Sequence, residues 1–380
     1  MGETKKRLVE LDVLRGVSVF GMILVITPGS WGHRFEWTNH AEWQGYPLSD
    51  MIFPSFLFCV GMSIALSFNR RNPDSIFQLI LKVFKRTLAL FIIGIVINGF
   101  PYYDLENIRI PGILQRIALS YMIVTCFWIV LQSKQVNQPI IWLSIVSVLI
   151  LAAYYVLLYY IPVPGIGVTG DSPAYSWPSM VDQQIFGINH LWKYGVTDDK
   201  VTYDPEGILA TFPASVNVVI GLIIGLIYTR YTSFYTSGNL IILGGCLLII
   251  GVTLDYTSVA PSIKKIWSSS FVLLSGGFSL LLFVMIKLVL EKLPKTRIYL
   301  QPFIVYGGNA IIAFALSNML VPIFDLPIVG EKSMRYLGFE FFNSFIYHEK
   351  WSSMSFAIAF LIILFLPLRQ MYKRRIFLKL

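Results

Sequence analysis

Residues 138–161 read QPIIWLSIVSVLILAAYYVLLYYI, a run without a charged side chain. A run of about 20 apolar residues is long enough for an α-helix to cross the hydrocarbon core of a bilayer. Similar runs recur on both sides of this segment, so we expect about ten membrane-crossing helices. The expected spans are residues 12–29, 49–69, 78–100, 110–131, 138–161, 205–230, 238–256, 266–291, 302–323 and 353–372.

The composition supports this interpretation over the whole chain. Of its 380 residues 56% are hydrophobic and only 13% charged, and the mean hydropathy is +0.67. A soluble domain carries about 25% charged residues. The shortage of charge excludes a disordered chain, a nucleic-acid-binding module and an ordinary cytosolic enzyme. We therefore expect an all-α integral membrane protein, with residues 1–380 forming a single polytopic domain in the lipid bilayer.

The net charge of +9 follows from the positive-inside rule rather than from a nucleic-acid partner. With both termini in the cytoplasm, most lysines and arginines fall on the cytoplasmic side. Lys5, Lys6 and Arg7 precede the first apolar run without a cleavage pattern, so we expect a retained first span. This topology predicts a multi-pass protein of the cytoplasmic (inner) membrane, with a strongly basic inner face and an acidic outer face.

One larger extracytoplasmic loop is expected over residues 162–204. It is rich in aspartate and in aromatic residues, including Trp177, Trp192 and Tyr203. Acidic groups beside flat aromatic faces suit a polar, partly cationic ligand such as a sugar. An interfacial aromatic belt over a solvated loop explains the same residues.

Ionisable residues at membrane depth are costly and therefore informative. Arg116 lies inside an expected span, where it either faces an internal cavity or pairs with an acid such as Asp50. Arg15 lies one helical turn after Asp12, so it either forms an ion pair with that residue or anchors the helix at the cytoplasmic surface.

His40 is the leading candidate for chemistry. All four histidines fall on the expected outer side, and His40 precedes Asp50, at the start of an expected span, by ten residues. A carboxylate next to an imidazole orients the ring and raises its basicity, as in a nucleophile or general base. A solvated interfacial histidine is the alternative.

Other chemistries lack a signal in the sequence. The cysteines Cys59, Cys126 and Cys246 have no regular spacing, which predicts neither a disulfide framework nor a metal site. There is no HExxH, P-loop or GxSxG motif. No internal repeat supports an inverted-repeat transporter.

A set of short motifs gives the sequence its family resemblance. They are Leu11-Asp12-x-x-Arg15-Gly16, His40-Ala41-x-Trp43-x-Gly45, Asp50-x-x-Phe53-Pro54, Gly61-x-Ser63, Arg109-Ile-Pro-Gly-x-Leu-Gln-Arg116, Pro162-Val-Pro-Gly165, His190-Leu191, Tyr203-Asp-Pro-Glu-Gly207 and Leu273-x-Ser275 after Trp267-Ser268. In this order they resemble the heparan-α-glucosaminide N-acetyltransferase family, within the wider superfamily of transmembrane acyltransferases. The match is weaker after about residue 300.

The resemblance implies an N-acetyltransferase that moves acetyl from cytoplasmic acetyl-CoA to a glucosamine-type amine on the extracytoplasmic side. It implies that His40 is the catalytic histidine, and that Thr27 is the nearest counterpart of an active-site asparagine in the animal enzyme. Asp50, ten residues after His40, is the partner that we expect from its position. We expect the acceptor to contact Trp43, Trp192, Asp204 and Glu206. We expect acetyl-CoA to contact Arg15, Thr27, Arg86, Arg109, Gln115 and Arg116, with Lys82 and Lys85 as further candidates for its nucleotide.

Several alternatives stay open at this point. His40 forms an acetyl-histidine or acts as a general base. The acidic outer side favours a free or neutral-chain amino sugar over a polysulfated chain. An O-acyltransferase of cell-surface glycans and a sugar transporter are the rival functions, no metal is expected, and a homodimer is one open form of assembly.

Overall fold

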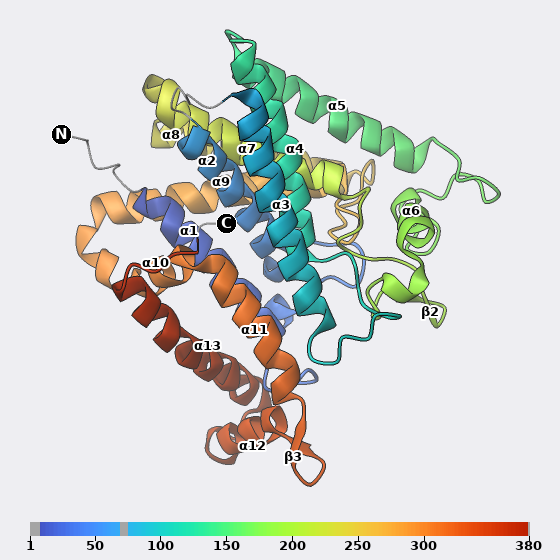
Figure 1. Ribbon diagram of the computed structural model, residues 1–380, viewed down its shortest axis with the longest axis vertical. Coiled ribbons are helices and arrows are strands. Elements are labelled where there is room, and N and C mark those ends of the chain that lie inside the picture. The colour runs from blue at the N-terminus through green and yellow to red at the C-terminus, as the bar shows by residue number, and fades with distance from the viewer. Residues whose placement is uncertain (1–7, 69–74, 379–380) are drawn as a thin grey trace. The chain divides into compact units, whose positions relative to one another are not determined.

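The computed structural model describes residues 8–68 and 75–378, and its regular structure is almost entirely helical (Figure 1). The α-helices are α1 (Val9–Ile26), α2 (Leu48–Phe68), α3 (Ile76–Gly99), α4 (Ile113–Ser133), α5 (Pro139–Tyr159), α6 (Trp177–Phe186), α7 (Thr211–Arg230), α8 (Ser237–Tyr256), α9 (Ser269–Lys292), α10 (Gln301–Gly308), α11 (Ala310–Phe324), α12 (Met334–Ile346) and α13 (Glu349–Lys373). The prediction of an all-α chain is confirmed.

Short elements connect these helices. The 3₁₀ helices are η1 (Glu36–Thr38), η2 (Ile188–His190), η3 (Thr232–Phe234) and η4 (Pro294–Ile298). Two antiparallel hairpins join β1 (Val196–Thr197) to β2 (Lys200–Val201) and β3 (Pro327–Val329) to β4 (Lys332–Ser333). The loop predicted over residues 162–204 is therefore partly ordered, because α6, η2 and the first hairpin lie within it.

Each predicted span coincides with helical structure. Residues 302–323 coincide with two helices, α10 and α11, which are bent by 86° at their junction. Within residues 8–68 and 75–378, seven helices are long and apolar enough to cross a membrane, or eight if the bent pair is one span. Helices α1 and α3 also have sufficient length, but each carries a group of charged residues: Glu10, Asp12 and Arg15 in α1, and Lys82, Lys85 and Arg86 in α3.

The structure thus supports a multi-pass membrane protein, while the count of about ten spans and the cytoplasmic position of both termini stay predictions. Of the basic residues used for the orientation, six lie outside the described part of the chain: Lys5, Lys6, Arg7, Arg70, Arg71 and Lys379.

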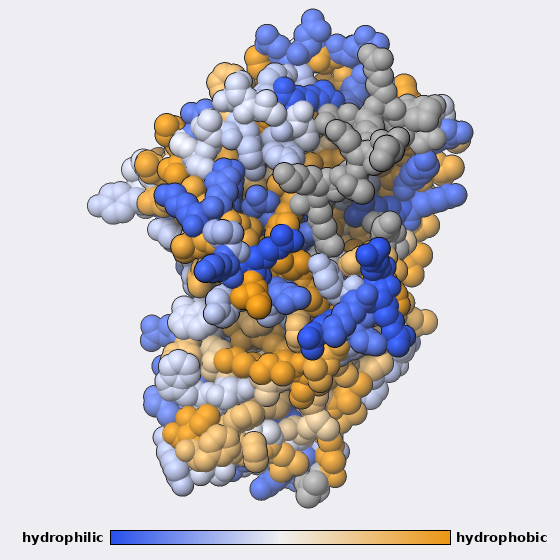
Figure 2. Space-filling model, turned by 90° about the vertical axis from the view of Figure 1, so that its left-hand side faces the viewer, coloured by the Kyte–Doolittle hydropathy of each residue, from blue (hydrophilic) through white to orange (hydrophobic). Residues whose placement is uncertain are grey.

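Two strongly apolar helices, α5 and α8, are the least buried of the seven candidate spans. Only 22% of the apolar window of α5 and 17% of that of α8 is buried, compared with 78% for α7. Figure 2 shows one face of the molecule, on which apolar residues cover broad areas between groups of hydrophilic ones. Apolar surface on this scale is not left to water, because its transfer to an apolar environment is favourable. We infer that lipid covers α5 and α8.

The chain divides into two compact units, each described by itself. Among the described residues, unit 1 comprises residues 8–40, 47–56 and 281–378, and unit 2 comprises residues 41–46, 57–68 and 75–280. In unit 1, α1 packs on α10, α11 and α13; in unit 2, α3 lies alongside α4, and α7 packs on α4 and α5 (Figure 1).

Glycines allow the closest helix packing in unit 2. A Cβ added to Gly221 of α7 would lie 2.0 Å from the Phe58 carbonyl oxygen of α2, and one added to Gly61 of α2 would lie 1.8 Å from the Val218 oxygen of α7. Small residues let two backbones approach in this way within a membrane, where no hydrophobic effect drives helices together. The contact of α2 with α7 therefore requires glycine at both positions.

This packing predicts that Gly221→Ala destabilises the protein. The new methyl group must push backbone apart, which costs about 1–3 kcal/mol in a well-packed interior. Gly245→Ala is the matched control, because a Cβ there meets nothing within 4 Å and alanine favours the helix. Thermal unfolding in detergent should show a lower midpoint for Gly221→Ala only. Equal midpoints for the two variants would contradict the packing argument.

Candidate active site

His40 and Asp50 form a hydrogen-bonded pair in unit 1. The His40 Nδ1 and Asp50 Oδ1 atoms lie 2.6 Å apart, with the His40 side chain 45% exposed and that of Asp50 only 1% exposed. A carboxylate accepts, so Nδ1 donates the proton and a neutral ring carries its lone pair on Nε2. The structure therefore brings together the two residues predicted to be catalytic.

Local structure holds this pair in place. Asp50 lies in the first turn of α2, where the helix dipole favours a negative charge. The neighbouring Ser49 hydroxyl donates to the carbonyl oxygen of Asn39 at 2.5 Å. The start of α2 thus fixes both the carboxylate and the backbone just before His40.

The other histidines have different surroundings. His33 Nδ1 lies 2.8 Å from Glu349 Oε2, but that carboxylate is 59% exposed. His190 Nδ1 lies 2.7 Å from the Ile108 carbonyl oxygen, and His348 caps the N-terminus of α13. Among the histidines, His40 alone has a hydrogen-bonded carboxylate that is buried in the described structure.

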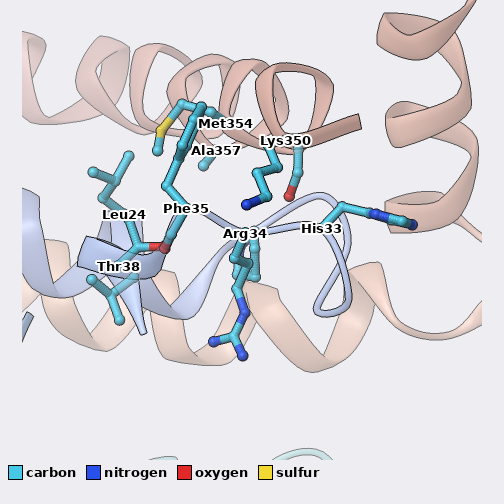
Figure 3. Close-up of a pocket in the computed structure, with 11 residues that line it drawn as sticks. Leu24, His33, Arg34, Phe35, Thr38, Lys350, Met354 and Ala357 are labelled. Atoms are coloured by element: carbon cyan, nitrogen blue, oxygen red, sulfur yellow. The ribbon is translucent and has the colours of Figure 1, made fainter. Parts of the chain in front are cut away.

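The pocket that includes Thr38, two residues before His40, is nearly filled. Its free volume of about 10 Å³ is roughly the minimum space that one water molecule needs. Figure 3 shows its lining by Leu24 of α1 and Met354 of α13, with the Lys350 side chain directed toward the loop that carries Arg34. Nearby, the hydroxyl of Thr27 is buried and donates to the Ile23 carbonyl oxygen at 2.8 Å.

Arg109 and two carboxylates form a buried charge cluster in unit 2. Arg109 donates from Nε and Nη2 to Asp204 at 2.8 and 2.6 Å, and from Nη2 also to Glu206. Burial alone would lower the pKa of Arg109, but Asp204 and Glu206 raise it above its usual value. The Asp204 side chain is 0% exposed and accepts from the Trp192 backbone N–H at 2.9 Å. The Asp204 carboxylate is therefore paired with Arg109 and is not accessible to solvent.

An aromatic group surrounds this cluster. The Trp43 ring packs edge-on against Tyr203, with centroids 5.1 Å apart, and its Nε1 donates to the Asp171 carbonyl oxygen at 3.0 Å. The ammonium group of Lys265 donates to the Tyr203 hydroxyl at 2.9 Å and to the backbone oxygen of Glu42. Lys265 was not predicted, because it lies far along the chain from residues 41–46.

Arg116 is fully buried in unit 2. Its Nη2 donates to the Gly207 carbonyl oxygen at 3.1 Å, and its guanidinium lies 4.8 Å from the centre of the Trp267 ring. Its Nε and Nη1, like the side-chain nitrogen of Gln115, have no hydrogen-bond partner among the residues that the structure describes. Gln115 and Arg116 therefore carry buried hydrogen-bond donors for which the described residues supply no acceptor.

The unmatched polar atoms continue along α4. The hydroxyls of Ser120 and Thr125 are buried and likewise unpartnered within residues 8–68 and 75–378. The Arg86 guanidinium of α3 lies 4.5 Å from the Tyr121 ring centre, and its Nε is also unpartnered in this part of the chain. A buried polar group without a partner costs about 1–3 kcal/mol, so such groups usually bind water or a ligand.

Arg15 is held at the start of α1. It lies 3.4 Å from Asp12, so the ion pair, one of the two alternatives for Arg15, is present, and it also donates to the Gly307 carbonyl oxygen of α10 at 3.5 Å. Among the described residues no group of three or more histidine, cysteine or acidic side chains is arranged to hold a metal ion.

Asp182 of α6 is a second residue that the motifs did not single out. It is 1% exposed, and one oxygen accepts from the Ile208 N–H at 2.9 Å while the other has no partner among the described residues. Burial raises the pKa of Asp182 to about 7; the Ile208 hydrogen bond and Arg116 oppose this shift, and Asp204 adds to it.

Comparison with known proteins gives one family. The family model described as heparan-alpha-glucosaminide N-acetyltransferase, catalytic, matches residues 7–256. The human heparan-alpha-glucosaminide N-acetyltransferase is 26% identical over 353 residues, which cover 81% of this chain and 52% of the human protein. The mouse protein of the same name is 26% identical over 356 residues, covering 82% and 53%. The chain spans about half the length of these curated relatives.

The buried Asp182 predicts a pH dependence of stability. An unfolded aspartate ionises near pH 4, as a rough reference value, whereas the folded Asp182 keeps its proton to about pH 7. Between these values the folded state binds more protons, so the free energy of unfolding falls as the pH rises. Asp182→Asn is neutral and still accepts from Ile208, so it should remove this contribution.

Thermal unfolding in detergent across this pH range checks the prediction. The midpoint of the wild type should fall more steeply with pH than that of Asp182→Asn. The exposed Asp199→Asn variant is the control and should follow the wild type. Parallel curves for wild type and Asp182→Asn would show that Asp182 is ionised throughout.

Proposed function

The chain belongs to the heparan-alpha-glucosaminide N-acetyltransferase family, and on this premise we propose that it is an acyltransferase that acetylates the amine of a glucosamine-type sugar. The donor is cytoplasmic acetyl-CoA, and the acceptor lies on the extracytoplasmic side. The observation that carries the proposal is the 2.6 Å hydrogen bond between half-exposed His40 and buried Asp50.

The proposal includes the topology. About ten helices cross the cytoplasmic membrane as one polytopic domain, with both termini inside and residues 162–204 outside. The apolar, poorly buried faces of α5 and α8 support membrane insertion. The excess of basic residues on the predicted inner side supports the orientation.

The acetyl group moves by acyl substitution at the thioester carbonyl. In one route the amine attacks this carbon while His40 Nε2 takes a proton from nitrogen; the C–N bond forms, the C–S bond breaks, and the proton passes to the departing CoA sulfur. In the other route Nε2 attacks the thioester carbon first, the C–S bond breaks, and CoA leaves as a thiolate from an acetyl-histidine. The amine then attacks the same carbon, the bond from the acetyl carbon to Nε2 breaks, and the proton lost by the amine passes to Nε2. In both, Asp50 orients the ring and stabilises its positive charge.

The acetyl-CoA assignment rests on polar groups that need a partner. Gln115 and Arg116 present unused donors inside unit 2, and Ser120, four residues after Arg116 on the same side of α4, extends them into a short polar row. A pantetheine arm, with its amides and hydroxyl, fits such a row because it supplies both acceptors and donors. Arg86 and Arg109 are further proposed contacts in unit 2, whereas Arg15 and Thr27 of unit 1 stay contacts predicted from the sequence. Acetyl-CoA supplies the activated acyl group.

The acceptor assignment rests on the outer face of unit 2. Trp43 and Trp192 supply flat apolar surface of the kind that packs on sugar rings. Arg109 donates hydrogen bonds to both Asp204 and Glu206. We therefore propose that Glu206 contacts the acceptor and that Asp204 positions Arg109. A neutral-chain or free amino sugar is the preferred class, since the outer loop is acidic.

His40→Ala should lower acetyl transfer by about 10²–10⁴-fold, the usual contribution of a general base. His33→Ala is the matched control, because its imidazole also contacts a carboxylate, at 2.8 Å, but an exposed one. The measurement is the rate of product formation from labelled acetyl-CoA. Label retained on the wild type without acceptor, and absent from His40→Ala, would select the covalent route. Full activity of His40→Ala would exclude both routes.

A panel of acceptors tests the substrate class. Free glucosamine and neutral amino-sugar oligomers should be acetylated faster than a sulfated heparin-like oligosaccharide, because the acidic loop repels polyanions. The product should resist mild alkali as an amide does. A product released by mild alkali would indicate an O-acyltransferase, and faster transfer to the sulfated chain would overturn the proposed acceptor class.

A further inference from the structure

A cleft of about 360 Å³ opens in unit 1, at the lower end of the size range of small-molecule sites. Its lining includes Lys295 and Arg297 of η4, Gln301 and Ile304 of α10, and Tyr372 near the end of α13. These residues lie outside the segment 7–256 that the family model matches. The comparison therefore assigns them no role.

The end of α9 places this cleft at the predicted cytoplasmic surface of the membrane. Helix α9 is long and apolar enough to cross a membrane, and η4, which carries Lys295 and Arg297, follows directly after its last residue, Lys292. The basic residues around the cleft are on the predicted cytoplasmic side. The cleft therefore opens where a cytoplasmic ligand can reach it.

The walls of the cleft are fixed by contacts on both sides of the bend between α10 and α11. Arg15 donates to the Gly307 carbonyl oxygen at the end of α10. The Asn309 side chain donates to the Ile376 carbonyl oxygen at 3.1 Å and accepts from the Leu378 N–H at 3.3 Å. These bonds hold α10 to α1 and the segment after α13 to the bend. The cleft is thus built by tertiary structure rather than by a loose turn.

The lining chemistry points to an anion with a flat ring. Lys295 and Arg297 are exposed cations, and the lining contributed by residues 8–68 and 75–378 includes no carboxylate. The nearby acid Glu291 is paired with Lys287 at 2.9 Å. Lysine and arginine bind phosphate through charge-assisted hydrogen bonds. The Tyr372 ring offers a stacking surface, and the Gln301 amide can both donate to and accept from a base edge.

We propose that this cleft binds the 3′-phosphorylated ADP end of acetyl-CoA, with Lys295 and Arg297 on the phosphates and Tyr372 against the adenine. The inference rests on the proposed function, because it takes acetyl-CoA as the donor. It assigns the nucleotide to residues that the sequence did not single out, since the sequence pointed to Arg15, Lys82, Lys85 and Arg86. An anionic lipid headgroup carries phosphate too, but it has no base for Tyr372 and Gln301.

The test compares CoA with dephospho-CoA, which lacks the 3′-phosphate, on the full chain in nanodiscs of zwitterionic lipid. The wild type should bind CoA about tenfold or more tightly than dephospho-CoA, the rough worth of a charged hydrogen bond. Lys295→Ala/Arg297→Ala should lose this preference. Lys292→Ala/Arg375→Ala removes the same charge outside the cleft lining and should keep it.

Substitutions of Tyr372 test the proposed adenine contact independently of the phosphate contacts. Tyr372→Leu should weaken binding of both ligands by roughly fivefold or more, whereas Tyr372→Phe keeps the ring and should match the wild type. Thermal unfolding of each variant shows whether it is folded.

The inference is overturned if the folded Lys295→Ala/Arg297→Ala variant keeps the preference for CoA. It is equally overturned if that variant loses only its association with anionic vesicles, which would assign the cleft to lipid. Adenosine 3′,5′-bisphosphate serves as the probe for direct binding, independent of any acetyl transfer. Binding of this probe without transferase activity would refute the proposed function while leaving the nucleotide site intact.

Discussion

A charge that leaves water needs a partner, and this constraint decides where the scarce charges of the chain lie. Asp50 is buried and is held by His40, while Asp204 is buried and is held by Arg109. Removing one partner of a buried pair leaves an uncompensated charge, which costs about 3–5 kcal/mol. Because an unpaired buried carboxylate is unfavourable, Asp50 stays hydrogen-bonded to His40. In the proposed reaction it therefore lies next to an imidazole that becomes positively charged during turnover.

Arg116 differs from these pairs in a way that points to function. It is fully buried, yet it donates to a backbone carbonyl oxygen and faces the Trp267 ring. Together with Gln115, it leaves donors unused among the described residues. A fold under selection for stability alone would satisfy or replace such groups, whereas a site for a polar ligand needs them.

The sequence predicted the helices well, because each apolar run of membrane length became helical. It also predicted the pairing of His40 with Asp50, since both lie close to the start of one helix. It did not predict the bend at Asn309, which tertiary contacts with residues 376–378 stabilise. Nor did it identify Asp182, whose environment comes from Ile208 and Asp204, residues remote in the chain. The spacing of residues in the sequence predicts local geometry only. The bend at Asn309 and the environment of Asp182 depend on contacts between segments that are distant in the chain.

The central claim is that acetyl crosses the membrane barrier within this protein and requires His40. Sealed proteoliposomes with labelled acetyl-CoA on one side and glucosamine on the other test it most directly. We expect labelled N-acetylglucosamine in the glucosamine compartment and free CoA retained in the acetyl-CoA compartment. With His40→Ala we expect no labelled product. Product formed only when both substrates share a compartment, or formed equally by His40→Ala, would contradict this claim.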